Sequence, residues 1–322
     1  MSEPSASERV RCIVAAVDFS PASDRAVEWA AAVAARRGAE LCLVHAVPFF
    51  VTMDMPLAVA NVAGDELVAA ARARLAATAQ ALQGRVGSVV SEAALGSVVA
   101  VILEAVQRHR PELLVLGTRG LRGWQHVLLG STAERVLGAA PCPVLAVHEG
   151  DPLPPRRPFR LVAASDGSED SRRAIRCAAQ LFELAPAAVL LHGFQPPPVF
   201  YSGAGEEPTY DIVAAARAAT MERLVDDAQI LAHGGIDARP MLRDGYPPDA
   251  IVEVARTLPA DLLVLGSRGR GGVAHLLLGS TAARVVQRAG TPVLVVSRRA
   301  AAAVEEAQGA LSIVGAPADD QC

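Results

Sequence analysis

The stretch Leu113-Leu-Val-Leu-Gly-Thr-Arg-Gly120 decides the fold of this chain, because it returns 149 residues later as Leu262-Leu-Val-Leu-Gly-Ser-Arg-Gly269. A second stretch, Leu128-Leu-Gly-Ser-Thr-Ala133, returns at the same spacing as Leu277-Leu-Gly-Ser-Thr-Ala282. A period this long is too large for a solenoid repeat and has the size of a whole domain. The chain is therefore predicted to contain one domain twice.

Length and composition agree with a duplicated globular domain. The chain has 322 residues, of which 52% are apolar and 20% charged. Residues 149–158 contain four prolines, which interrupt helices and central strands, so this segment is predicted to be a semi-rigid linker. The expected domains are residues 9–148 and 159–298, and residues 299–322 are expected to form a loose tail.

Each half alternates apolar, β-branched runs with amphipathic segments. In the first half, strands are expected at residues 12–17, 41–47, 86–92, 113–116 and 143–147, and helices at about 21–37, 65–82, 97–109 and 131–137. Strands that are apolar without alternation indicate a sheet covered on both faces. Right-handed crossovers then predict an α/β fold of two tandem, doubly wound, parallel five-stranded sheets. The expected strand order is 3-2-1-4-5, with the flavodoxin-like 2-1-3 order as the other arrangement.

Charge and cysteine content exclude several classes of protein. The net charge is −4, which argues against a nucleic-acid surface, and the absence of lysine excludes a phosphate loop of the Gly-Lys-Ser/Thr kind. The five cysteines form no C-x-x-C pair and are expected to be buried, reduced thiols. No signal peptide, membrane-spanning run or metal-ligand spacing is found, so a cytoplasmic protein without a metal site of its own is expected.

Polar and glycine positions recur where such a sheet would hold a ligand. Asp18 and Asp166 end the first strands of the two halves, and Gly117 and Gly266 end the fourth strands. Ligands of open α/β sheets bind at the carboxyl ends of strands, where the strand order reverses. The spacing Gly-x2-Gly-x9-Gly-Ser occurs in both halves, and its last glycine opens a helix whose free N–H groups suit an anion. An aspartate there suits a ribose hydroxyl or a metal better than a triphosphate.

This pattern resembles the ATP-binding branch of the universal stress protein family, in tandem two-domain form, over roughly residues 9–148 and 159–298. The resemblance implies a Rossmann-like, adenine nucleotide alpha hydrolase-like fold, with the two halves paired through their last strands. It also implies ATP with Mg²⁺ in each half. The aspartate would hold the ribose, the residue after the second-strand histidine the adenine, and the glycine loop and hydroxyls the phosphates. The implied binding residues are Ala16, Asp18, Ala46, Gly117, Arg119, Gly120, Gly130, Ser131 and Thr132 in the first half, and Ala164, Asp166, Gly193, Gly266, Arg268, Gly269, Gly279, Ser280 and Thr281 in the second.

Several of these residues have simpler interpretations. Asp18 and Asp166 could merely cap the following helices, and Arg119 and Arg268 could be solvated loop arginines. His45 and His192 are expected to be hydrogen-bonded core residues, without a catalytic role. The halves differ at Phe19/Gly167, Leu121/Arg270 and Trp124/Val273, so unequal affinity is expected, with packing the simpler role for Trp124. The long segments 48–61 and 195–210 are either lids or plain connectors.

Four functions fit the sequence. The first is a nucleotide-binding stress-response regulator, forming homo-oligomers and hydrolysing ATP slowly if at all. The second is an ATP-cleaving enzyme, against which the loops Asp18-Phe-Ser20 and Asp166-Gly-Ser168 argue. The third is a scaffold for protein interactions without nucleotide. The fourth is a receptor for another ligand in the same crevice, such as a cyclic dinucleotide.

Overall fold

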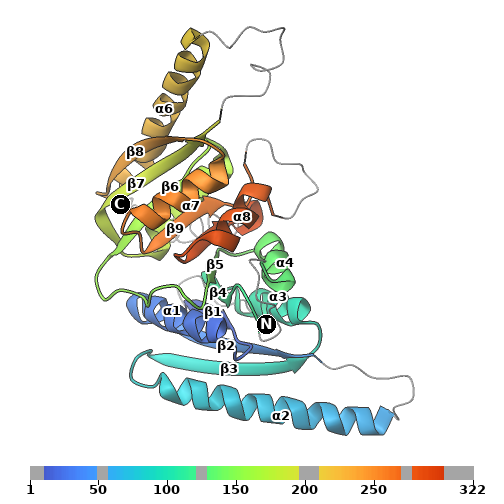
Figure 1. Ribbon diagram of the computed structural model, residues 1–322. Helices are drawn as coiled ribbons and strands as arrows, with labels where there is room; N and C mark the ends of the chain where they lie inside the picture. The colour runs from blue at the N-terminus through green and yellow to red at the C-terminus, as the bar shows by residue number, and fades with distance from the viewer. Residues whose placement is uncertain (1–10, 49–56, 121–128, 196–209, 270–277, 301–322) are drawn as a thin grey trace, which may run out of the picture.

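A computed structural model describes residues 11–48, 57–120, 129–195, 210–269 and 278–300 (Figure 1). The first half contains strands β1 (Cys12–Ala16), β2 (Glu40–Val47), β3 (Ser88–Leu95), β4 (Leu113–Gly117) and β5 (Val144–Val147), with helices α1 (Pro21–Arg37), α2 (Leu57–Ala81), α3 (Val98–His109) and α4 (Ser131–Ala139). The second half contains strands β6 (Phe159–Ala164), β7 (Leu184–Phe194), β8 (Asp237–Asp244), β9 (Leu262–Gly266) and β10 (Val293–Val296), with helices α5 (Glu169–Leu181), α6 (Tyr210–Ala232), α7 (Pro247–Thr257) and α8 (Ser280–Arg288).

The described strands form one continuous ten-stranded sheet in the order β3-β2-β1-β4-β5-β10-β9-β6-β7-β8. Within each half the strands are parallel and follow the order 3-2-1-4-5, which confirms the predicted fold and excludes the flavodoxin-like order. The halves meet where β5 and β10 pair antiparallel, with Leu145 opposite Leu294. Because this pairing occurs within one chain, the outer edges of the sheet are β3 and β8, and the last strands are not open for association with another copy.

Both ends of helix α1 are determined by residues next to them in the sequence. Ser20 is its N-cap and accepts a hydrogen bond from the Ser23 N–H, and Pro21 occupies the first turn. Gly38 ends the helix in the left-handed conformation with φ 60°. Helix α2 departs from expectation because it begins at Leu57 and not near residue 65, so the connector before it is shorter than predicted.

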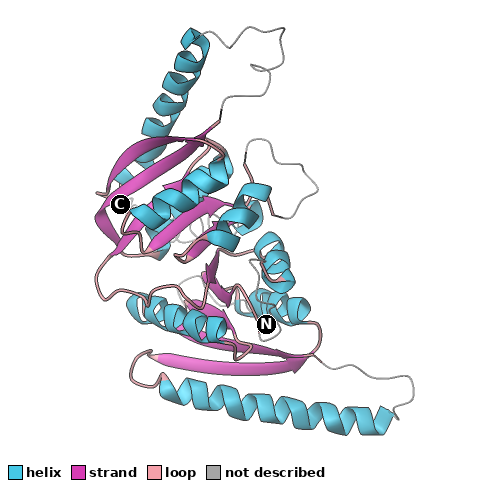
Figure 2. Cartoon of the chain, in the orientation of Figure 1, coloured by secondary structure: helices cyan, strands magenta, loops and turns pink. Residues whose placement is uncertain are grey.

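Two helical layers cover the sheet (Figures 1 and 2). Alternate strand residues such as Ile13 and Val14 face opposite sides, as the period of a strand requires. One side packs against α1, α2, α5 and α6, and the other packs against α3, α4, α7 and α8. Each of these two cores contains residues from both halves, so the apolar packing continues across the β5–β10 junction.

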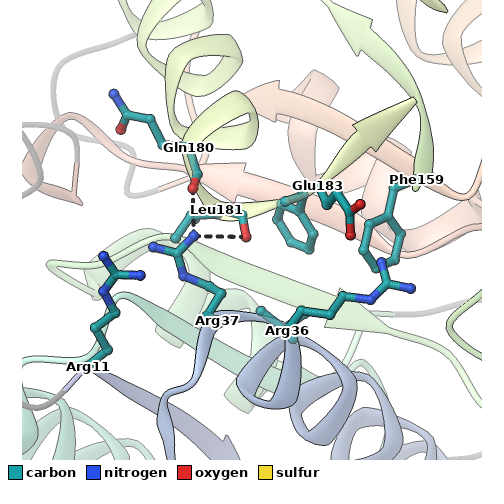
Figure 3. Close-up of a pocket in the computed structure, with 9 residues that line it drawn as sticks. Arg11, Arg36, Arg37, Phe159, Gln180, Leu181 and Glu183 are labelled. Atoms are coloured by element: carbon teal, nitrogen blue, oxygen red, sulfur yellow. Dashed lines mark hydrogen bonds between the residues drawn. The ribbon is translucent and has the colours of Figure 1, made fainter. Parts of the chain in front are cut away.

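The proline-rich linker is fastened to both halves. Trp29 of α1 is fully buried and donates from Nε1 to Pro152 O at 2.9 Å. Arg157 pairs with Asp261 of the second half at 2.6 Å. A cavity of about 330 Å³ lies beside this joint, between the ends of α1 and α5 (Figure 3). Arg37 donates across it to the Gln180 and Leu181 carbonyls, which are the last acceptors of α5, so the cavity is part of the joint between the halves.

Four cysteines fall within the described residues, namely Cys12, Cys42, Cys142 and Cys177, and all four are buried and outside disulfides, in line with the expectation of buried, reduced thiols. Burial raises the pKa of Cys12, Cys42 and Cys142 to about 12. Within the described ranges, none of the helices combines the length and apolar character needed to cross a bilayer.

Candidate functional site

Two loops meet at the carboxyl ends of β1 and β4, which are neighbours in the sheet. The Oδ1 atom of Asp18 accepts a hydrogen bond from the Ser20 N–H at 3.0 Å, so the β1–α1 loop holds the carboxylate in place. The other oxygen, Oδ2, lies 2.5 Å from the point that a Cβ of Gly120 would occupy. The carboxylate therefore lies directly against the glycine loop, and only glycine fits at position 120 without a shift.

The second half repeats this arrangement at the ends of β6 and β9. Asp166 Oδ1 accepts from the Ser168 N–H at 3.0 Å, and Asp166 Oδ2 lies 2.7 Å from the Cβ position of Gly269. Because β5 and β10 pair antiparallel, the two pairs of loops lie at opposite ends of the strands. Helices α1 and α5 have their own serine caps, Ser20 and Ser168, so the helix caps are not the aspartates.

The remaining motif glycines allow close backbone approach. A Cβ on Gly117 would lie 2.9 Å from the Ser23 nitrogen, and one on Gly266 would lie 3.1 Å from the Ser171 nitrogen. These glycines therefore let the fourth strand of each half end directly beside the first helix. In the first half Ser20 Oγ also donates to Arg119 O at 3.2 Å, which ties the two loops together.

The glycines before α4 and α8 do not have the free N–H groups that the sequence analysis expected for an anion. The Gly130 N–H donates to Thr118 O at 3.1 Å, and the Gly279 N–H donates to Ser267 O at 2.8 Å. These two N–H groups are therefore engaged inside the loop. Neither glycine offers a side-chain cap, so the donors available to an anion are the N–H groups of the following helical turn, which begins at Ser131 or Ser280.

The side chains expected at the phosphates lie at the surface of the crevice. Arg119, Gly120, Ser131, Gly269 and Ser280 are exposed, whereas Arg268, Thr132 and Thr281 are half-buried. The positions Leu121, Trp124, Arg270 and Val273, and most of segments 48–61 and 195–210, lie outside the described residues.

The expected base contacts lie at the ends of the first two strands of each half. Ala16 and Ala46 are buried, with Ala16 beside Val44 of β2 and Ala46 beside Ala94 of β3. Ala164 likewise ends β6 and is buried. Gly193 has a packing reason for lacking a side chain.

Helix α7 leaves no room for a side chain at Gly193. A Cβ on Gly193 would lie 2.7 Å from the Pro247 Cα at the start of this helix. Glycine at position 193 is thus required by packing, whether or not its backbone also meets a ligand.

The two strand histidines are half-buried, and each is hydrogen-bonded, as expected. His45 Nδ1 lies 2.6 Å from Val17 O, and His192 Nδ1 lies 2.6 Å from Ser165 O. A carbonyl oxygen can only accept, so Nδ1 carries the hydrogen in each case. Both histidines therefore fasten the second strand to the loop that follows the first.

The loops differ most at the residue after the aspartate. Phe19 has φ 62° and Gly167 has φ 73°, so both adopt the left-handed conformation, which is costly only for phenylalanine. The Phe19 ring lies between His45, at 4.7 Å between centroids, and the Arg74 guanidinium, 4.0 Å from the ring centroid. In the second half Gly167 takes the place of Phe19 and has no ring, and the Cδ atom of Arg223 lies 3.6 Å from the Cβ position of Gly167.

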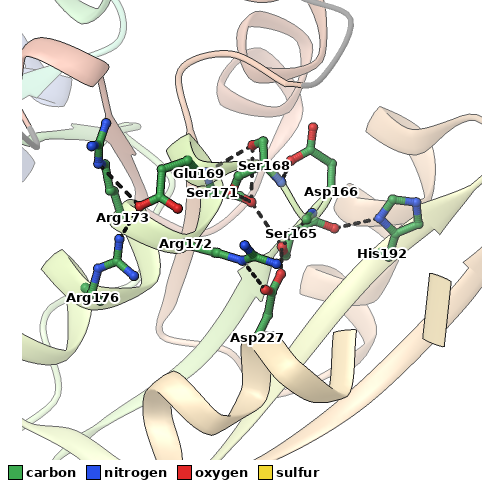
Figure 4. A network of polar contacts seen from close by, with 11 residues as sticks. Ser165, Asp166, Ser168, Glu169, Ser171, Arg172, Arg173, Arg176, His192 and Asp227 are labelled. Carbon is green, nitrogen blue, oxygen red and sulfur yellow. Dashed lines mark hydrogen bonds and ion pairs between the residues drawn. The ribbon is translucent and has the colours of Figure 1, made fainter. Parts of the chain in front are cut away.

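The second half supports its loop with a buried polar network instead (Figure 4). Asp227 of α6 is 1% exposed and accepts from Ser165 Oγ at 2.5 Å and from Arg172 Nε at 2.6 Å. Ser165 Oγ also accepts from the Gly167 N–H at 3.0 Å. Val17 replaces Ser165 in the first half, so the sites are built on the same plan but held by different interactions.

Comparison with known proteins agrees with this duplicated arrangement. The profile of the Universal stress protein family matches residues 10–148 and 159–297. A universal stress protein of Mycobacterium tuberculosis is 33% identical over 305 residues, covering 88% of this chain and 95% of the relative. A universal stress protein of Thermus aquaticus is 33% identical over 137 residues, covering 42% of this chain and 96% of the relative. The crystal structure of a universal stress protein from Archaeoglobus fulgidus superposes with a TM-score of 0.61 at 21% identity, covering 89% of this chain and 98% of that one.

Proposed function

The chain belongs to the universal stress protein family, and on this premise we propose that each half binds an adenine nucleotide, ATP with Mg²⁺, as a regulatory ligand. Binding would bias the conformation or the assembly of a stress-response protein. The proposal treats residues 9–148 and 159–298 as the two binding domains, joined by the linker at residues 149–158.

The observation that carries the proposal is the packing of a carboxylate against a glycine loop in both halves. Asp18 and Asp166 each accept a hydrogen bond at Oδ1 within their own loop, and Oδ2 lies against Gly120 or Gly269. An oriented carboxylate oxygen is a good acceptor for the two hydroxyls of a ribose. The uncapped starts of α4 and α8 lie after the same glycine loops and offer N–H groups to phosphate oxygens.

The chemistry of the described residues favours binding over turnover. Among the described residues, the strand histidines His45 and His192 are already hydrogen-bonded to backbone carbonyls through Nδ1. Asp18 and Asp166 are held as acceptors beside glycine, which suits the proposed role of ribose ligands. We therefore expect ATP hydrolysis slower than about one turnover per second, below the range of typical enzymes.

Calorimetric titration of Mg-ATP into nucleotide-stripped protein tests the proposal. Two sites per chain would support a functional crevice in each half. One site would limit the proposal to a single half, and the Phe19/Gly167 difference would be examined first. The absence of both heat and thermal stabilisation would overturn ATP as the ligand, and the same titration with cyclic dinucleotides would then test the alternative ligand.

A further inference from the structure

Three side chains with metal-binding chemistry converge on the face of the first half that α3 and α4 cover. Cys42 of β2, Glu92 of β3 and His109 of α3 place one ligand atom each within 4.8 Å of one another. Cys42 Sγ lies 3.5 Å from His109 Nε2, and the same nitrogen lies 3.5 Å from Glu92 Oε1. Cys42 and Glu92 are 50 residues apart in sequence, and Glu92 and His109 are 17 apart, so no ligand spacing in the sequence indicates the cluster. The fold alone brings the three residues together.

These distances match the separation of ligands around one zinc ion. Zinc lies about 2.3 Å from sulfur and about 2.0–2.1 Å from imidazole nitrogen, so tetrahedral ligands of these two kinds are about 3.5 Å apart. A thiolate, an imidazole and a carboxylate form a donor set that suits zinc, a metal of borderline softness. Three protein ligands leave a fourth position for water or another small ligand.

The surroundings of the cluster also favour a cation. His109 is in the last turn of α3, where the helix dipole is negative. The second carboxylate oxygen of Glu92 pairs with Arg108 Nη1 at 2.6 Å, which orients Glu92 and leaves Oε1 facing His109. A cavity of about 250 Å³ adjoins Glu92 beside the edge strand β3, and Glu104, Arg72 and Arg108 also line it.

The second half is a built-in comparison, because every member of the cluster is replaced there. Strand pairing and the repeated motifs align Cys42 with Val189, Glu92 with Met241 and His109 with Leu258. Those three residues pack against the apolar core of that face. Arg108 is likewise replaced, by Thr257. The fold therefore accepts an apolar trio at these positions, and the first half holds three polar residues there that packing does not require.

The backbone after the cluster differs as well. Arg110 follows His109 with φ 44°, a left-handed conformation that among the described non-glycine residues is shared only with Phe19. The counterpart helix α7 ends at Thr257, and its C-cap residue Leu258 has φ −90°. Arg110 therefore ends α3 immediately after His109 with a left-handed cap that the second half lacks.

We propose that Cys42, Glu92 and His109 form a zinc site in the first half, remote from the nucleotide crevice and absent from the second half. Binding replaces the thiol proton of Cys42 with a sulfur–zinc bond and releases that proton to solvent. The ion links β2, β3 and α3, so it adds stability to the first half in a zinc-dependent way. The site is independent of the proposed nucleotide function, and its test contains no nucleotide.

The test is a titration of Zn²⁺ into metal-free, full-length protein without a histidine tag, in competition with a chromophoric chelator. Cys322 lies outside the described residues and is replaced by serine throughout, so that its thiol cannot contribute. We expect one zinc per chain, and a rise in melting temperature on addition of zinc. Cobalt substitution is expected to give the charge-transfer absorption of a thiolate ligand.

The variants Cys42→Val, Glu92→Met and His109→Leu introduce the residues of the second half. Cys42→Val and His109→Leu are each expected to lower zinc affinity at least about 100-fold and to abolish the cobalt–thiolate band or alter its energy. Cys142→Thr is the matched control, because it replaces another buried cysteine with its counterpart in the second half, Thr291, and is expected to leave zinc binding unchanged. Failure of the parent protein to bind one equivalent, or binding that survives all three replacements together, would overturn the site.

Discussion

The Oδ2 atom of Asp18 lies 2.5 Å from the point that a Cβ of Gly120 would occupy, although the two residues are about a hundred positions apart. Asp166 and Gly269 repeat the relationship at 2.7 Å. Because both halves keep it, the contact belongs to the plan of the crevice and is not an accident of one loop. It makes the glycine loop the most direct place to perturb the proposed ligand site.

Gly120→Ala is expected to displace the Asp18 carboxylate and to weaken nucleotide binding in the first half about 10-fold or more, which corresponds to about 1.4 kcal/mol. Gly269→Ala should do the same in the second half. Titration calorimetry would then show one weakened site in each variant. Gly87→Ala and Gly290→Ala are the controls, since an added Cβ meets nothing within 4 Å at either position. Unchanged affinity in both loop variants would place the nucleotide elsewhere.

Ser20→Ala is expected to lower the free energy of unfolding by about 1–2 kcal/mol. The substitution removes the acceptor for the Ser23 N–H and the donor to Arg119 O, so it loosens both the helix start and the link between the loops. Ser97→Ala is a matched control, because Ser97 occupies the N-cap of α3 without a side-chain cap bond. Urea unfolding would compare the two, and equal losses would contradict a special role for Ser20.

Phe19→Ala is expected to be less stable than Phe19→Gly by about 1 kcal/mol, the reverse of the usual order. Both variants lose the ring contacts with His45 and Arg74, but only alanine keeps the cost of a Cβ at φ 62°. Thermal or urea unfolding of the pair measures the difference. The converse change, Gly167→Ala, should destabilise by a similar amount because φ is 73° there. A more stable alanine variant at position 19 would show that the loop relaxes.

Features that are set by residues adjacent in the sequence are easier to predict than features that depend on residues far apart in the chain. Helix α1 is specified by adjacent residues, Ser20, Pro21 and Gly38, and its predicted bounds are confirmed. The expected start of α2 was wrong by eight residues: Pro56 immediately precedes the true start at Leu57, but Gly64, which lies inside the helix, favoured a later start. The strand order was predicted from the alternation of strands and helices, and the repeated motifs placed the aspartates and the glycine loops at the same edge of the sheet.

Contacts between distant, unrepeated residues could not be predicted. Cys42, Glu92 and His109 come from three different elements, and nothing in the linear spacing relates them. The Asp227 network of the second half was missed for the same reason, since Val17 replaces Ser165 in the first half and no repeated motif marks it. The engagement of the Gly130 N–H with Thr118 O also depends on loop geometry that composition does not set.

The joint between the linker and the second half is expected to weaken in acid. Burial alone would raise the pKa of Asp261, but hydrogen bonds from Arg157 and Arg160 outweigh it and lower the pKa to about 2. The ordinary pKa of an aspartate is about 3.9, so the unfolded chain takes up the proton first as the pH falls. The stabilisation by Asp261 is therefore fully present above about pH 4 and is lost as the pH falls toward about 2.

Asp261→Asn tests this pH dependence. At pH 7 the variant is expected to lose about 1–2 kcal/mol, a modest value because both arginine partners are more than 40% exposed. The difference from the parent should shrink as the pH falls below about 4, since the parent then loses the same interaction. Glu112→Gln is the matched control: Glu112 occupies the corresponding position of the first half and pairs with Arg37 and Arg11 without contacting the linker. Urea unfolding across this pH range measures both variants, and a stability difference for Asp261→Asn that does not change with pH would mean that the carboxylate charge does not hold the joint.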